Sequence, residues 1–76
     1  MNKERRKRLT DSIDKIAAVK DSIDSVKFQE EDALDNLPEN FQGTDRYLDA
    51  EEKIDSLEGA LSDLTSAIRN LEKAIS

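Results

Sequence analysis

The stretch 45–75 reads DRYLDAEEKIDSLEGALSDLTSAIRNLEKAI, and it decides the fold of the chain. Apolar or small side chains recur in it at alternating steps of three and four residues: Tyr47, Ala50, Ile54, Leu57, Leu61, Leu64, Ile68, Leu71 and Ile75. This spacing keeps one apolar line on a single side of a helix, where it can be buried against another helix. We therefore predict a helix over residues 45–75 that packs lengthwise on a partner helix.

The first half of the chain carries a similar but interrupted pattern. We predict a helix over residues 3–35, with Asn2 as its N-terminal cap. Its apolar line also advances by three and four residues, through Leu9, Ser12, Ile16, Val19, Ile23, Val26, Glu30, Ala33 and Leu37. Ser12 and Glu30 interrupt this line. Pro38 ends the helix, because proline lacks an amide hydrogen and disfavours helical geometry at the residue before it.

Residues 36–44 form the turn between the two helices. They contain Pro38 and Gly43, which are typical of turns, and Thr44 can cap the second helix. So short a connection returns the second helix antiparallel to the first. We predict that residues 1–76 form a single all-α domain, an antiparallel two-helix hairpin with coiled-coil packing.

Matching the two apolar lines predicts the register of the hairpin. If Leu37 faces Tyr47, facing residues have numbers that sum to about 84. Glu30 then lies near Ile54, where an ion pair with Lys53 can explain the interruption of the first line. The predicted core places Leu57, Leu61, Leu64, Ile68 and Leu71 opposite Ile16, Val19, Ile23 and Val26.

A single hairpin of this composition leaves much apolar surface exposed. The chain has 76 residues, and below about 70–80 residues a core seldom contributes more than about 3–5 kcal/mol. Several apolar side chains also fall beside or outside the predicted lines: Ile13, Ala17, Phe28, Leu34 and Leu48. We therefore expect a homodimer, in which two hairpins form an antiparallel four-helix bundle.

The composition argues against catalysis and against bound cofactors. The chain has no cysteine and no histidine, so thiolate ligands and the commonest general base are both missing. Two helices also offer no pocket that could desolvate a carboxylate for acid–base chemistry. We expect a non-enzymatic protein without cofactor or metal. No apolar run approaches the roughly 18–20 residues of a membrane span, so we expect a cytoplasmic protein without membrane contact.

Charge is distributed unevenly along the chain. The net charge is −6, yet the first ten residues carry a basic tip that consists of Lys3, Arg5, Arg6, Lys7 and Arg8. These side chains could contact nucleic-acid phosphates. Alternatively, they could complement the C-terminal end of the second helix, whose dipole favours cations, or an acidic partner chain. We favour the second role, because the basic residues surround the helix and the rest of the chain is acidic.

Phe28 and Leu48 are the candidate partner-binding residues. Phe28 lies about 60° beyond the edge of the apolar stripe on the first helix, where burial within a hairpin is poor. Exposed apolar side chains often anchor interfaces. Two alternatives stay open for Phe28, which are packing in the homodimer and binding of a different protein.

The turn and the start of the second helix resemble a group of small proteins. The residues that carry the resemblance are Asp35-Asn36-Leu37-Pro38-Glu39, Phe41-Gln42 and Asp45-Arg46-Tyr47, followed by the Ile-x-x-Leu-x-x-Ala repeat, and the basic opening Asn2-Lys3-Glu4-Arg5-Arg6 fits them. They are similar to those of uncharacterised small helical-hairpin proteins from Gram-positive bacteria and their phages or mobile elements. The Asn-Leu-Pro-Glu turn is the distinctive part. The resemblance implies a helical hairpin of bacterial or phage origin, and it implies no activity and no site residue.

The function we expect is that of a small protein–protein interaction or regulatory module that self-associates and presents a helical surface to an unidentified protein partner. Two alternatives remain. One is a nucleic-acid-binding dimer of helical hairpins that uses the basic tip, and the other is a phage-encoded acidic inhibitor of a host protein.

Overall fold

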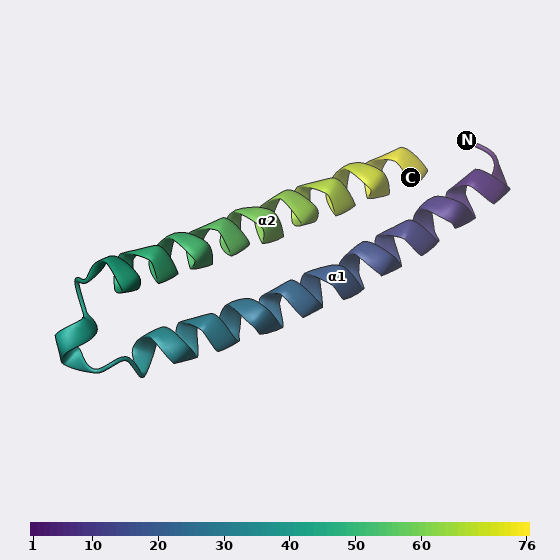
Figure 1. Ribbon diagram of the computed structural model, residues 1–76. Coiled ribbons are helices and arrows are strands. Elements are labelled where there is room, and N and C mark those ends of the chain that lie inside the picture. The colour runs from purple at the N-terminus through teal and green to yellow at the C-terminus, as the bar shows by residue number, and fades with distance from the viewer.

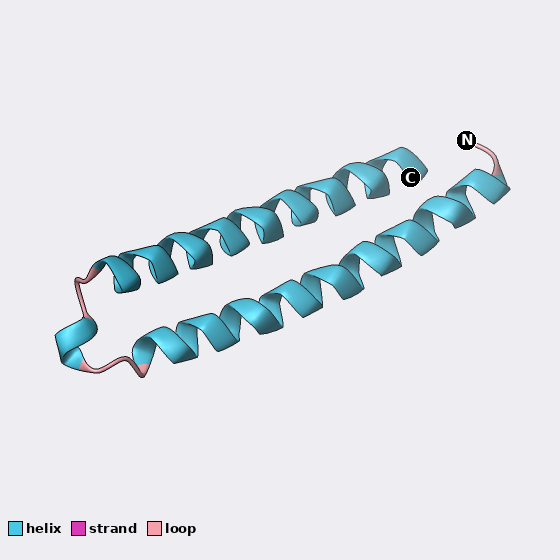
Figure 2. Cartoon of the chain, in the orientation of Figure 1, coloured by secondary structure: helices cyan, strands magenta, loops and turns pink.

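The computed structural model describes residues 1–76, which form two long helices joined by a short turn (Figure 1). Helix α1 spans Lys3–Asp35 and helix α2 spans Asp45–Ile75, with a short 3-10 helix, η1, at Glu39–Phe41 between them. The helices run antiparallel, and the chain contains no strand (Figure 2). The predicted all-α hairpin and the bounds of its two helices are confirmed.

Side chains cap both helices at the residues expected from the sequence. The Asn2 side-chain oxygen accepts a hydrogen bond from the backbone N–H of Arg5 at 2.8 Å. The Thr44 hydroxyl accepts one from the backbone N–H of Tyr47 at 3.4 Å. Each bond satisfies an amide that the first turn of a helix leaves without a partner.

The turn places the start of α2 beside the end of α1. Gly43 has a φ of +78°, in the left-handed region that residues with side chains rarely adopt. The backbone N–H of Phe41 donates to the Pro38 carbonyl at 2.9 Å, which closes η1. The Thr44 hydroxyl donates to the Phe41 carbonyl and ties η1 to the first residue before α2. The sequence predicted a turn here but not its short 3-10 helix.

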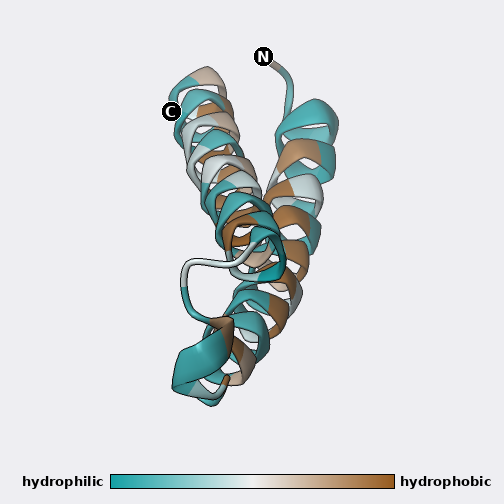
Figure 3. Ribbon diagram, turned by 60° about the vertical axis from the view of Figure 1, so that its left-hand side comes forward, coloured by the Kyte–Doolittle hydropathy of each residue, from teal (hydrophilic) through white to brown (hydrophobic).

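The contact between the helices contains little fully buried surface. Ile54, near the turn, is the most buried residue, and 8% of its surface is exposed. The less exposed side chains of α2 follow the predicted apolar line: Tyr47, Ala50, Ile54, Leu57, Leu61, Leu64, Ile68, Leu71 and Ile75. In the view of Figure 3, many of the apolar segments of each helix lie on the side toward the other helix.

Helix α1 is rotated about its own axis relative to the prediction. Val19 and Val26, which we expected in the core, are 50% and 46% exposed. That part of the predicted core is wrong. The less exposed side chains of α1, together with Leu37 in the turn, are instead Leu9, Ile13, Ile16, Lys20, Ile23, Lys27, Glu31 and Leu34.

The rotation replaces small side chains in the contact by larger ones. Ile13 and Leu34 take the places that the sequence pattern assigned to Ser12 and Ala33, and they bury more apolar area. The same rotation places Lys20 and Lys27 in the helix contact, at the positions that the sequence pattern assigned to Val19 and Val26. Lys27 is half-buried because its methylene stem can cover apolar surface while its ammonium group stays in water.

The register agrees with the prediction to within about one residue. The Lys27 ammonium lies 3.6 Å from the Glu58 carboxylate across the two helices, so facing residues have numbers that sum to 85. The predicted ion pair between Glu30 and Lys53 does not form, although, beside the larger effect of Asp49, the Glu30 carboxylate lies near enough to contribute to the raised pKa of Lys53. Lys53 pairs instead with Asp49 of its own helix at 3.0 Å, since residues four apart are neighbours on a helix surface.

Candidate functional site

One side of the hairpin carries a line of apolar side chains on each helix, with charged and polar side chains such as Glu30, Lys53 and Ser56 among them. Val19 and Val26 lie seven residues apart on the flank of α1 that the rotation leaves exposed, and Ala33 continues this flank. Val26 lines a shallow depression together with Ser56 and Leu57 of α2, so these flanks of the two helices lie on the same side. We call this surface the apolar face, and it consists of Val19, Val26, Ala33, Leu57, Ala60, Leu64, Ala67 and Leu71.

The apolar face is continuous along α2. Leu57, Ala60, Leu64, Ala67 and Leu71 follow one another at steps of three and four residues, which keeps them on one flank of the helix. All five are half-buried, because one edge of the flank contacts α1 while the other edge faces solvent. A single hairpin therefore leaves part of its most regular apolar surface uncovered.

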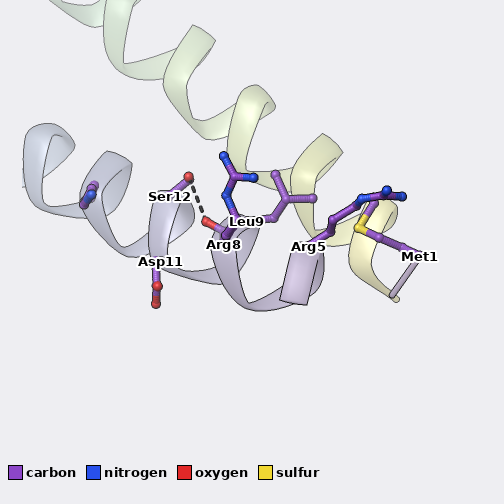
Figure 4. A pocket seen from close by; sticks show the side chains of 7 residues that line it. Met1, Arg5, Arg8, Leu9, Asp11 and Ser12 are labelled. Carbon is purple, nitrogen blue, oxygen red and sulfur yellow. Dashed lines mark hydrogen bonds between the residues drawn. The ribbon is translucent and has the colours of Figure 1, made fainter. Parts of the chain in front are cut away.

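Charged side chains of opposite sign lie at the two ends of the apolar face. At the open end, where the termini lie, a depression is lined by basic side chains: Arg5, Arg8 and Lys15. Figure 4 shows Arg5, Arg8 and Leu9 on one side of α1, with Asp11 pointing away from them. At the turn end, the depression beside Val26 is lined largely by acidic side chains: Glu30, Asp49 and Glu52, with Lys53.

The other side of the hairpin is acidic. Two depressions there are lined by carboxylates, which we call the acidic face: Asp21, Asp24, Glu31, Asp35, Glu51, Asp55 and Glu58. Nowhere in the chain does a group of three or more acidic side chains lie close enough together to hold a metal ion. These carboxylates stand open to solvent on two neighbouring helices, an arrangement suited to binding a basic surface.

Lys27 links the two helices beside the acidic face. Its ammonium group lies 3.3 Å from the Glu31 carboxylate and 3.6 Å from that of Glu58. The hydrogen bond to Glu31 is the main cause that raises the pKa of Lys27 above its ordinary value, and Glu58 adds to it. Lys27 therefore stays protonated at neutral pH and can bridge α1 and α2.

The basic tip is fully available to a partner. All five of its side chains are exposed, and none of them belongs to any of the three ion pairs of the structure. Arg5 and Arg8 lie on the side of the apolar face, whereas Lys3, Arg6 and Lys7 fall on other sides of the helix. No ion pair joins the tip to α2, and nucleic-acid binding by these residues stays a prediction.

The two candidate partner-binding residues are exposed but are not brought together. Phe28 is 70% exposed and Leu48 is 52% exposed. In the observed register Phe28 lies level with Leu57, about 13 Å along the axis from Leu48. Phe28 also lies about 200° around α1 from Val26, away from the apolar face.

Sequence reasoning missed Val19 and Val26 as surface residues. The seven-residue spacing of Ser12, Val19, Val26 and Ala33 places them on one flank of α1. This spacing alone does not show whether the flank contacts α2 or faces solvent. The sequence signal for the observed rotation is a second line with the same spacing that passes through Ile13 and Leu34, whose side chains are larger than those of Ser12 and Ala33.

Comparisons with protein-family models, with curated proteins and with solved structures found no match to this chain. Neither helix contains a segment that is both long and apolar enough to cross a membrane.

Proposed function

We propose that this protein is a non-enzymatic protein-interaction module that acts as a homodimer, in which two hairpins bury their apolar faces against each other. The observation that carries the proposal is the apolar face itself. It runs over both helices, and one hairpin leaves the α1 part exposed and the α2 part half-buried. A second copy has the same surface, so a two-fold symmetric contact can cover both at once and form a four-helix bundle.

The exposed area of the hairpin supports this proposal. The chain measures 59 × 15 × 12 Å and exposes 5894 Å². A compact monomer of 8.6 kDa would expose about 4,700 Å². The excess, about 1,200 Å², exceeds the roughly 800 Å² that each partner buries in a standard interface.

The surfaces that remain outside such a dimer could receive a different protein. Phe28 and Leu48 lie away from the apolar face, and the acidic face lies on the opposite side of the hairpin. We propose that Phe28 serves a foreign partner rather than self-association. The open, solvated carboxylates favour binding over catalysis, because acid–base catalysis requires a desolvated group.

Self-association predicts the mass of the protein in solution. We expect sedimentation equilibrium at tens of micromolar to give twice the 8.6 kDa of one chain, with dissociation toward 8.6 kDa on dilution. The physical reason is the gain from removing the apolar faces from water. A mass of 8.6 kDa that does not change with concentration over this range would contradict the proposal.

A further inference from the structure

The charge of the hairpin differs strongly between its two ends. Residues 28 and 57 are level in the observed register, so a plane through them separates the turn half, residues 28–57, from the open half. The turn half holds two basic and ten acidic side chains, for a net charge of −8. The open half holds ten basic and eight acidic side chains, for a net charge of +2, and the two values give the total of −6.

Two hairpins can bury their apolar faces around a two-fold axis in two ways. An axis along the hairpin places both turns at the same end, so that the two −8 halves lie side by side. An axis across the hairpin places the turn of one copy beside the termini of the other, so that each −8 half meets a +2 half. Repulsion between like charges disfavours the first arrangement, and attraction favours the second.

We propose that the homodimer is antiparallel, with the acidic turn of each hairpin against the basic tip of its partner. This inference rests on the proposed self-association and adds its geometry. In the antiparallel arrangement, α1 lies along α1 of the partner. Arg5 and Arg8, which have no ion pair within the hairpin, then approach the partner's turn.

The side chains on the exposed flank of α1 match this arrangement pair by pair. If Val19 packs on the partner's Val26, facing residues of the two α1 helices have numbers that sum to 45. Lys15, four residues before Val19, then meets the partner's Glu30, four residues after Val26. Symmetry forms the same ion pair a second time. Neither Lys15 nor Glu30 has an ion-pair partner within its own hairpin.

The same register lets the two hairpins overlap along their full length. The two-fold axis passes halfway between Val19 and Val26 of α1. This level is near the middle of the hairpin, which extends from Lys3 at the open end to η1, Glu39–Phe41, at the turn. A single register therefore satisfies three conditions at once. Val19 contacts the partner's Val26, Lys15 pairs with the partner's Glu30, and the two hairpins overlap along their full length. Glu30, which interrupts the apolar pattern, gains a partner in it.

A distance between the two turns tests the arrangement. The chain has no cysteine, so a spin label on Asn40→Cys, in η1, reports only this position. Pulsed electron paramagnetic resonance on the labelled dimer should give a distance close to the 59 Å length of the hairpin. Dipolar broadening of the continuous-wave spectrum, which labels separated by about the 10 Å spacing of neighbouring helices would cause, would overturn the antiparallel arrangement while preserving the dimer. The absence of both any intermolecular distance and this broadening would overturn self-association as well.

A charge exchange tests the proposed ion pair. Lys15→Glu and Glu30→Lys should each raise the dissociation constant of the dimer about tenfold, since the contact occurs twice. The combined variant should restore the original value, because it reverses the pair without removing it. Glu51→Lys on the acidic face makes the same charge change as Glu30→Lys and should shift the constant by about twofold at most. Failure of the combined variant to recover would overturn the pairing.

Discussion

Ile54→Asp should abolish the cooperative unfolding of this protein. Ile54 is the one residue with less than a tenth of its surface exposed, and it lies where α1 and α2 meet near the turn. An aspartate there would bury a charge in the helix contact, beside Leu34 and near the carboxylates of Glu31 and Asp35, which costs several kcal/mol. A chain of this size has only about 3–5 kcal/mol to lose. Thermal unfolding followed by far-ultraviolet circular dichroism would measure the loss.

Leu48→Asp provides the matched control for this substitution. It makes the same kind of change on the same helix, six residues earlier, at a side chain that is 52% exposed. We expect the control to melt close to the wild-type temperature, because its new charge remains in water. Cooperative melting of Ile54→Asp near the wild-type temperature would show that α1 does not cover this position.

The double substitution of Val19→Asp and Val26→Asp should dissociate the homodimer. Both valines are half exposed in one hairpin but lie at the centre of the proposed interface. The change therefore places four carboxylates in the contact of two chains, each with a desolvation cost. We expect the dissociation constant to rise at least about a hundredfold, as sedimentation equilibrium would measure.

Phe28→Asp is the control for the interface. Phe28 is the most exposed large apolar side chain of the hairpin, and it lies away from the apolar face. The account therefore expects this variant to keep the wild-type mass. If Phe28→Asp dissociates the dimer and the double valine variant does not, the homodimer interface lies on the side of Phe28 and not on the apolar face. Circular dichroism on both variants separates a lost interface from lost helices.

The sequence was sufficient to predict α2 and insufficient to predict the rotation of α1. In α2 the line from Tyr47 to Ile75 carries the large apolar side chains, and the second line beside it adds only Ala60 and Ala67, so the side of the helix that faces α1 is well defined. In the first half of the chain two lines share Leu9, Ile16, Ile23 and Leu37 but diverge elsewhere. One adds Ser12, Val19, Val26 and Ala33, and the other adds Ile13, Lys20, Lys27 and Leu34. Which of the two lines contacts α2 depends on how well its side chains pack against those of α2. The spacing of apolar residues in the sequence does not determine this packing.

The position of the apolar face depends on which line of α1 side chains contacts α2. Exposure of Phe28 and Leu48 could be predicted, because both lie outside every apolar line of their helices. The apolar face could not be predicted once Val19 and Val26 had been assigned to the core of one hairpin. Glu30 was similarly misassigned. Its expected partner Lys53 forms an ion pair with Asp49 within α2, so Glu30 lies near Lys53 at the turn end of the apolar face without forming an ion pair.

Small-angle X-ray scattering of the unmodified protein tests most directly whether two hairpins bury their apolar faces. It measures the mass and the largest dimension of the particle together. Our account predicts a mass of twice 8.6 kDa and a largest dimension close to the 59 Å of one hairpin, because the two copies lie side by side. A mass of 8.6 kDa, or a dimer nearly twice as long as one hairpin, would contradict it.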